Sequence, residues 1–99
     1  MTATPTDRSL RDILFVLNPV SGDIDKSELE QTISEYCAEH GRTARFYHTH
    51  GHNDLLKLQN ALHHYCPDAL FAAGGDGTAS LAAEAVVGTS TPLGILPLG

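Results

Sequence analysis

The fold of this chain is decided by residues 69–78, ALFAAGGDGT, in which a short apolar run leads straight into a cluster of three glycines. The apolar run has the length and composition of a strand that is buried on both faces, as in a parallel sheet. Glycine permits a positive φ and lets a bulky anion approach the main chain, and a following helix points its free amides and positive dipole end at that anion. The stretch therefore predicts a strand, a phosphate-binding loop and a helix over about residues 79–87.

Strands and helices alternate over the rest of the chain. The other elements are predicted, in chain order, as a strand at 12–18, a helix that ends before Gly41, a strand at 43–48, a helix at about 53–65 and a strand at 93–96. These lengths suit βαβ crossovers. We therefore expect an α/β, three-layer Rossmann-like fold with a mostly parallel sheet and helices on both faces.

The first two helices carry apolar residues at helical spacing, which predicts the faces that they bury. The expected core residues are Leu29, Ile33, Tyr36 and Cys37 in the first helix and Leu55, Leu58, Leu62 and Tyr65 in the second. Cys37 and Cys66 are both expected on apolar helix faces, as buried free thiols rather than a disulfide.

Three polar segments follow predicted strands directly. They are Asn18 to Gly22, the turn around Thr49, and the glycine cluster. Ligands of parallel α/β sheets bind beyond the carboxyl ends of the strands, so these segments are expected to converge on one crevice.

The glycine cluster has a chemical and a purely structural interpretation. Thr78 can donate its hydroxyl to a phosphate oxygen or cap the helix, and Asp76 can hold magnesium through water, orient the loop or handle an acceptor hydroxyl. The alternative is a strand-to-helix turn that needs glycine only for its geometry. The cluster is neither a Walker A loop nor Gly-x-Gly-x-x-Gly.

Four segments form a pattern in chain order. They are Asn18-Pro19-Val20-Ser21-Gly22, Thr49 followed by Asp54, Gly74-Gly75-Asp76-Gly77-Thr78, and Gly94-Ile95-Leu96-Pro97-Leu98-Gly99. Together they resemble the diacylglycerol kinase catalytic domain, which is also found in sphingosine kinases and bacterial lipid kinases. NAD kinases carry a loop related to the glycine cluster.

The resemblance implies an ATP-binding domain that transfers a phosphoryl group from Mg-ATP to a lipid hydroxyl, such as that of diacylglycerol. It implies ATP contacts from Asn18, Ser21, Thr49, Gly74, Gly75, Asp76, Gly77, Thr78, Ala79 and Ser80. It assigns no catalytic residue to this chain, and Mg²⁺ ligands are expected mainly outside it.

The sequence departs from the family pattern at three positions. Ser80 and Leu81 stand where the family often has Asn-Glu, and Asn53 stands where a glycine usually precedes Asp54. Residues 1–11 are expected to be a flexible tail, and 12–99 the first portion of a truncated ATP-binding domain without its lipid-binding domain. This portion alone is not expected to turn over substrate.

Composition limits the partners. The formal net charge is -6 and the six Lys and Arg residues are scattered, which argues against nucleic acid as a partner. The longest apolar run, Ile13 to Leu17, is too short to span a bilayer. A cytoplasmic protein is expected, with peripheral membrane contact and self-association left open.

Two other functions remain open at this point. One is an NAD kinase relative, and the other is a non-catalytic module that binds a nucleotide or a partner. His48, His50 and His52 alternate, so in an extended strand they would share a face and could bind a transition metal; solvated histidines at the crevice rim are the simpler interpretation.

Overall fold

The computed structural model describes residues 10–18 and 26–97. Within them, strands and helices alternate as β1 (Asp12–Leu17), α2 (Lys26–Glu39), β2 (Thr43–His48), α3 (Asp54–Tyr65), β3 (Ala69–Gly74), α4 (Asp76–Val86) and β4 (Leu93–Pro97). The order confirms the alternation predicted from the sequence.

The strands form one sheet in the order β2-β1-β3-β4, and every pair is parallel. β1 is central because its residues Ile13 to Leu17 are apolar without interruption and buried on both faces. In β1, Phe15 lies opposite Phe46 of β2 on one side and Phe71 of β3 on the other, with ring centroids 5.6 and 5.7 Å away. These rings stabilise the parallel register on one face of the sheet.

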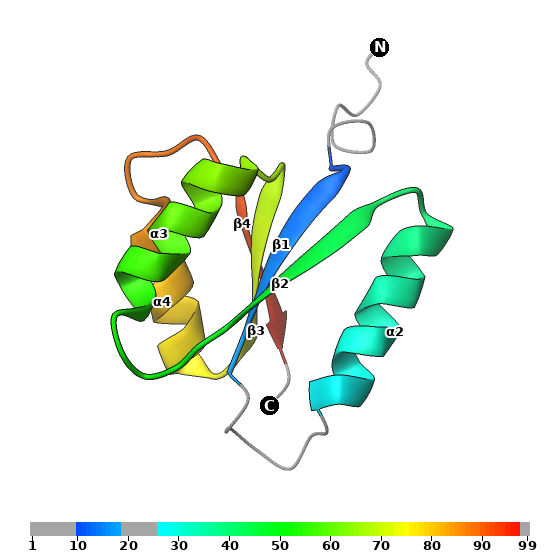
Figure 1. Ribbon diagram of the computed structural model, residues 1–99, viewed down its shortest axis with the longest axis horizontal. Coiled ribbons are helices and arrows are strands. Elements are labelled where there is room, and N and C mark those ends of the chain that lie inside the picture. Colours follow the sequence, from blue (N-terminus) through cyan, green and yellow to red (C-terminus); the bar gives the residue numbers. More distant parts are fainter. Residues whose placement is uncertain (1–9, 19–25, 98–99) are drawn as a thin grey trace.

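Helices cover both faces of the sheet, which confirms the three-layer prediction. α2 lies on one side, whereas α3 and α4 lie on the other (Figure 1). Alternate strand residues supply the two cores. The core under α3 and α4 contains Leu14, Val16, Leu58, Leu62, Leu70, Ala72, Ala82 and Ala85, and the core under α2 contains Ile13, Phe15, Ile33 and Cys37.

The start of the last helix differs from the prediction. α4 begins at Asp76, inside the glycine cluster, rather than at residue 79. Gly75 is extended at φ -90°, and the cluster contains no glycine with positive φ, so glycine is not needed here for a left-handed conformation. Burial of Thr78, Ala82 and Ala85 against the sheet extends the helix into a segment that local propensity assigns to a loop.

Three residues expected in the core are exposed instead. Tyr36 and Tyr65 are 59% and 42% exposed, because each lies at the edge of its helical stripe while Ile33, Cys37, Leu58 and Leu62 take the buried centre. The guanidinium of Arg45 lies 4.5 Å over the ring of Tyr65. Cys66 is exposed at the end of α3, whereas Cys37 is buried; both thiols are free, as predicted.

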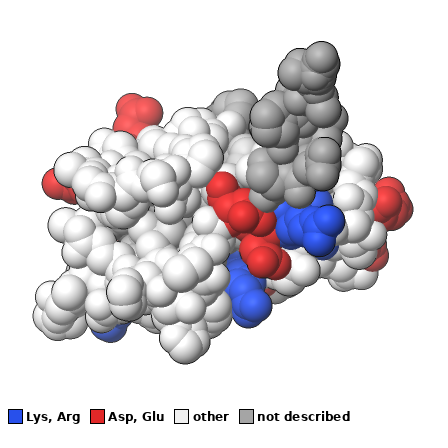
Figure 2. Space-filling model, turned by 90° about the horizontal axis from the view of Figure 1, so that it is seen from above, with Lys and Arg blue, Asp and Glu red and all other residues white. Residues whose placement is uncertain are grey.

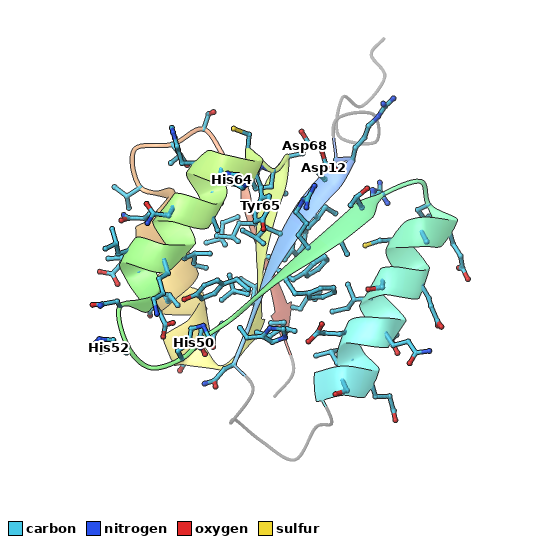
Figure 3. The ribbon with its side chains drawn as sticks, in the orientation of Figure 1. Asp12, His50, His52, His64, Tyr65 and Asp68 are labelled. Carbon is cyan, nitrogen blue, oxygen red and sulfur yellow. The ribbon has the colours of Figure 1, made fainter. Side chains whose placement is uncertain are left out.

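Charged side chains meet at the amino ends of the strands. Figure 2 shows this end, where acidic and basic groups lie next to one another. The Asp68 carboxylate accepts hydrogen bonds from the amides of Arg11 and Asp12, both at 2.9 Å. Asp12 and Asp68 lie at the opposite end of the sheet from His50 (Figure 3).

In the described part of the chain, no helix is both long enough and apolar enough to cross a bilayer.

Candidate functional site

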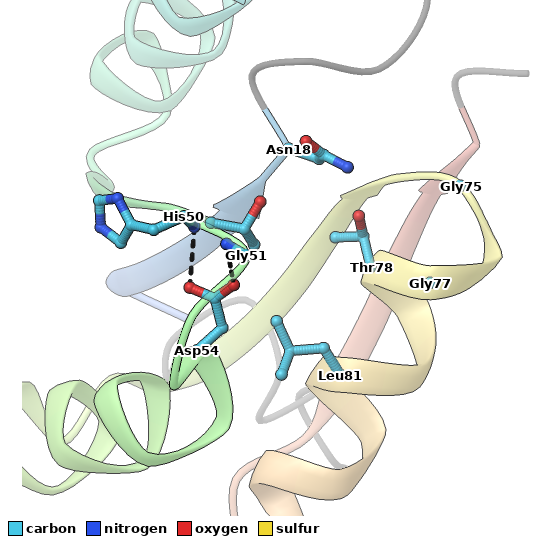
Figure 4. A pocket seen from close by; sticks show the side chains of 9 residues that line it. Asn18, His50, Gly51, Asp54, Gly75, Gly77, Thr78 and Leu81 are labelled. Atoms are coloured by element: carbon cyan, nitrogen blue, oxygen red, sulfur yellow. Dashed lines mark hydrogen bonds between the residues drawn. The ribbon is translucent and has the colours of Figure 1, made fainter.

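A cleft of about 460 Å³ opens at the carboxyl end of the sheet. β2 lies on one side of β1 in the sheet, and β3 lies on the other. The cleft lies between the carboxyl ends of β1 and β3, where the strand order reverses direction, which is the usual ligand position in such sheets. Its walls come from the ends of β1 and β2, the start of α3 and the first turns of α4 (Figure 4). The lining residues are Asn18, Thr49, His50, Gly51, Asp54, Gly75, Gly77, Thr78 and Leu81.

The structure brings five of the ten predicted site residues to this cleft. These are Asn18, Thr49, Gly75, Gly77 and Thr78. Four others belong to the same loop and helix but do not line the cleft, namely Gly74, Asp76, Ala79 and Ser80. Ser21 lies outside the described residues. The strand ends therefore converge as the periodicity predicted.

The three glycines of the cluster have different surroundings. A Cβ on Gly74 would lie 2.7 Å from Oγ1 and 3.0 Å from Cβ of Thr78, so this glycine permits close packing of the helix on the strand. A Cβ on Gly75 or Gly77 would meet nothing within 4 Å, although both residues line the cleft. Their bare main chain leaves space that a ligand can occupy.

The amino end of α4 faces the cleft without a side-chain cap. Gly75 is the N-cap residue, and the first intrahelical bond runs from the Ala79 amide to the Gly75 carbonyl at 3.1 Å. The earlier amides have no acceptor within the helix, as at any helix start. Thr78 is 5% exposed and its hydroxyl lies on the cleft side (Figure 4). This arrangement suits an anion.

The opposite wall is the Thr49 turn, residues 49–51, which Asp54 holds in place. The His50 amide donates to Oδ1 of Asp54 at 2.9 Å, and the Gly51 amide donates to Oδ2 at 2.7 Å. The Tyr47 hydroxyl donates to Oδ1 at 2.7 Å. The turn is thus fixed by the first residue of α3.

These contacts set the pKa of both side chains. Desolvation acts to raise the pKa of Asp54, but the bonds from His50, Tyr47 and Gly51 outweigh it, so the pKa lies below its ordinary value. Burial, followed by the hydrogen bond to Asp54 and its negative charge, raises the pKa of Tyr47 to about 12. Asp54 is therefore a carboxylate and Tyr47 a neutral donor at neutral pH.

The cleft is short of positive charge. Among its described lining residues there is no Lys or Arg, and Asp54 is the only carboxylate. A bound phosphate chain would depend on amides, hydroxyls, the helix dipole and an accompanying cation for charge compensation.

Sequence reasoning did not assign four lining residues to the site. Asp54 was noted as part of a motif without a role, Leu81 as a departure from the family pattern and His50 as a histidine at the crevice rim, whereas Gly51 gave no signal of its own. The departure at Asn53 has a structural explanation. This residue has a left-handed backbone conformation, at φ 55° and ψ 30°. Glycine adopts this conformation most readily, and asparagine tolerates it better than most other residues do.

The alternating histidines do not share a face. β2 ends at His48, which pairs with Glu30 of α2, while His50 lies in the Thr49 turn and His52 is exposed. Within the described ranges, no three His, Cys, Asp or Glu side chains come together as metal ligands.

The sequence matches the model of the diacylglycerol kinase catalytic domain over residues 12–99. The chain belongs to this family. It is the family that the four motifs indicated, rather than that of the NAD kinases. The match covers β1 and β3, between whose carboxyl ends the cleft lies, and it extends over every described strand and helix.

Two crystal structures of Bacillus anthracis strain Sterne proteins assigned as diacylglycerol kinases share the fold. Each is 24% identical in sequence over 88% of this chain, with a TM-score of 0.68. The chain spans only 30% and 32% of their lengths. No curated protein matches the sequence significantly.

Proposed function

We propose that this chain is the ATP-binding lobe of a lipid kinase. The nucleotide's phosphates bind at the amino end of α4, over Gly75, Gly77 and Thr78, and Asn18 and Thr49 contact it from the facing strand ends. An ATP contact from Ser21, which belongs to the same motif as Asn18 and lies outside the described residues, is part of this proposal. The observation that carries the proposal is the uncapped start of α4, where Gly75 and Gly77 present bare main chain to a cleft of about 460 Å³. This volume is within the size range of small-molecule sites.

Mg²⁺ is proposed to enter with the nucleotide. The described lining residues offer no basic side chain, so the phosphate charge needs another cation, and Mg²⁺ is commonly held by phosphates with one or two carboxylates. Asp76 is the carboxylate of this loop and is exposed at the first position of α4. A role through bound water is the one we propose for it.

The complete reaction is proposed for a longer protein. The acceptor hydroxyl of a lipid such as diacylglycerol forms a new bond to the γ-phosphorus, the bond to the β-γ bridging oxygen breaks, and the hydroxyl proton passes to a base. No described residue is assigned as that base. The lipid pocket, a peripheral membrane contact, any self-association and a cytoplasmic location belong to this wider proposal.

Calorimetric titration with Mg-ATP tests the proposal through Gly75. Its backbone is extended and an added Cβ meets open space, so Gly75→Asp and Gly75→Asn are expected to fold. A carboxylate within roughly 6 Å of a phosphate charge costs about 1–3 kcal/mol at effective dielectric constants of about 20–50. Gly75→Asp should therefore weaken binding about 5- to 100-fold, and Gly75→Asn should weaken it less.

Ala83→Asp is the matched control for net charge. Ala83 is exposed on α4 and does not line the cleft. This variant should bind Mg-ATP with the affinity of the unaltered chain. Equal affinities for the unaltered chain and Gly75→Asp would contradict the proposal. If Ala83→Asp lost as much affinity as Gly75→Asp, the loss would be an effect of net charge alone and would not support binding at Gly75.

A further inference from the structure

The Thr49 turn is fastened to the fold at both ends. At its start, the Thr49 amide donates to the Leu17 carbonyl at 2.9 Å, which ties it to β1. At its end, the His50 and Gly51 amides donate to the two carboxylate oxygens of Asp54. The dashed lines of Figure 4 show these two bonds beside the cleft. The wall therefore has a defined position relative to the sheet.

Tyr47 extends the fastening back into β2. Its hydroxyl donates to the same Asp54 oxygen that accepts from the His50 amide. Its ring meets the His50 imidazole edge to face at 5.8 Å, and it also packs against the core under α3 and α4. A carboxylate from one helix and a phenol from one strand thus hold a single turn between them.

We propose that Tyr47 and Asp54 are positioning residues that preset the Thr49 turn for the nucleotide bound across the cleft. The inference rests on the proposed function. A turn already held in its bound conformation loses less entropy when a ligand binds. The pair acts through Thr49 and its neighbouring amides, and neither side chain needs to touch ATP.

The hydrogen bonds to Asp54 also reduce the repulsion between its negative charge and a bound polyanion. Asp54 lines a cleft proposed for a polyanion, where a bare carboxylate would repel the ligand. Three donors, the two amides and the Tyr47 hydroxyl, direct its charge into the turn. The lowered pKa of Asp54 and the raised pKa of Tyr47 agree with this arrangement.

Two substitutions remove the fastening in steps. Tyr47→Phe keeps the ring and removes one hydrogen bond, so the affinity for Mg-ATP should fall about 3- to 10-fold. Asp54→Asn keeps the shape but leaves one acceptor oxygen for three donors, so the affinity should fall about 10-fold or more. Tyr36→Phe removes an exposed hydroxyl on α2 that does not line the cleft, and it should leave the affinity for Mg-ATP unchanged.

The experiment combines Mg-ATP affinity with amide NMR and thermal melting. In Tyr47→Phe the amide protons of His50 and Gly51 should exchange faster with solvent and shift, while the melting temperature moves by less than about 5 °C. In the unaltered chain, Mg-ATP should slow exchange at both amides. A merely structural contact would lower the melting temperature without changing affinity once the protein is folded.

The possible failures are distinguishable. If the unaltered chain does not bind Mg-ATP, the proposed function falls and the positioning role falls with it. If it binds but Tyr47→Phe and Asp54→Asn bind equally well, only the positioning role is overturned. If both variants fail to fold, unchanged exchange at His50 and Gly51 in the unaltered chain on adding Mg-ATP overturns the role by itself.

Discussion

One added methyl group should have opposite effects on stability at two positions of the glycine cluster. At Gly74, a Cβ would lie 2.7 and 3.0 Å from two atoms of Thr78, which is buried in the first turn of α4 and has little freedom to move. At Gly77, a Cβ would meet nothing within 4 Å, and the residue is already helical. Gly74→Ala should therefore strain the fold, whereas Gly77→Ala should stabilise it.

The magnitudes follow from these surroundings. Overpacking at a tight contact costs about 1–3 kcal/mol, so Gly74→Ala should lower the free energy of unfolding by that amount. Replacing a helical glycine by alanine contributes about 0.5–1 kcal/mol, so Gly77→Ala should raise it. In a domain of this size, each kcal/mol corresponds to roughly 4–8 °C in melting temperature. The two variants should melt on opposite sides of the unaltered chain.

Urea denaturation and Mg-ATP titration on the same three proteins provide the assay. Gly77→Ala should be more stable but bind Mg-ATP more weakly, because its methyl group enters the space proposed for the nucleotide. Equal stability losses in the two variants would refute the reasoning about packing. A stabilised Gly77→Ala with unchanged affinity would refute the assignment of Gly77 to the phosphate site.

Other predictions follow from packing and pKa. A Cβ on Gly94 of β4 would lie 2.4 Å from the Phe71 ring, so Gly94→Ala should lower the free energy of unfolding by about 1–3 kcal/mol in urea denaturation, and a neutral result would show that the ring does not cover this glycine. Burial, and then the carboxylate partner, raise the pKa of Tyr47 to about 12. Its contribution to the free energy of unfolding should therefore be fully present below pH 10 and be lost as the pH rises from 10 toward 12. This alkaline component should be absent in Tyr47→Phe, and identical pH profiles of the two proteins would contradict the raised pKa. A thiol reagent should modify exposed Cys66 readily and buried Cys37, whose pKa is raised by desolvation, only on unfolding; simultaneous modification would argue against the burial of Cys37.

The sheet and the position of the cleft were predictable because they depend on patterns along the chain. An unbroken apolar run from Ile13 to Leu17 requires two covered faces, and this gave β1 its central place. The carboxyl ends of parallel strands meet at one edge. Asn18, Thr49 and the glycine cluster were therefore expected together, and all three reach the cleft.

The remaining features depend on tertiary contacts that no local pattern encodes. Glycine is a poor helix residue, so local propensity predicted that α4 begins at about residue 79. In the structure the helix begins at Asp76, because Thr78 is buried against the sheet. The bond between Tyr47 and Asp54 joins a strand to a helix, a contact that neither the strand period nor the helix period predicts. Tyr65 fitted the stripe of α3 by spacing, but the narrow buried face ends at Leu62.

The most direct test of the central claim is an NMR titration of the nitrogen-15-labelled chain with Mg-ATP. A phosphate chain seated on the start of α4 should shift the amide signals of Gly75, Gly77 and Thr78 most strongly, together with that of Thr49 across the cleft. Signals from Gly88, at the other end of α4, should not move. Saturating Mg-ATP that leaves the three α4 amides unchanged, or that shifts Gly88 instead, would contradict the account.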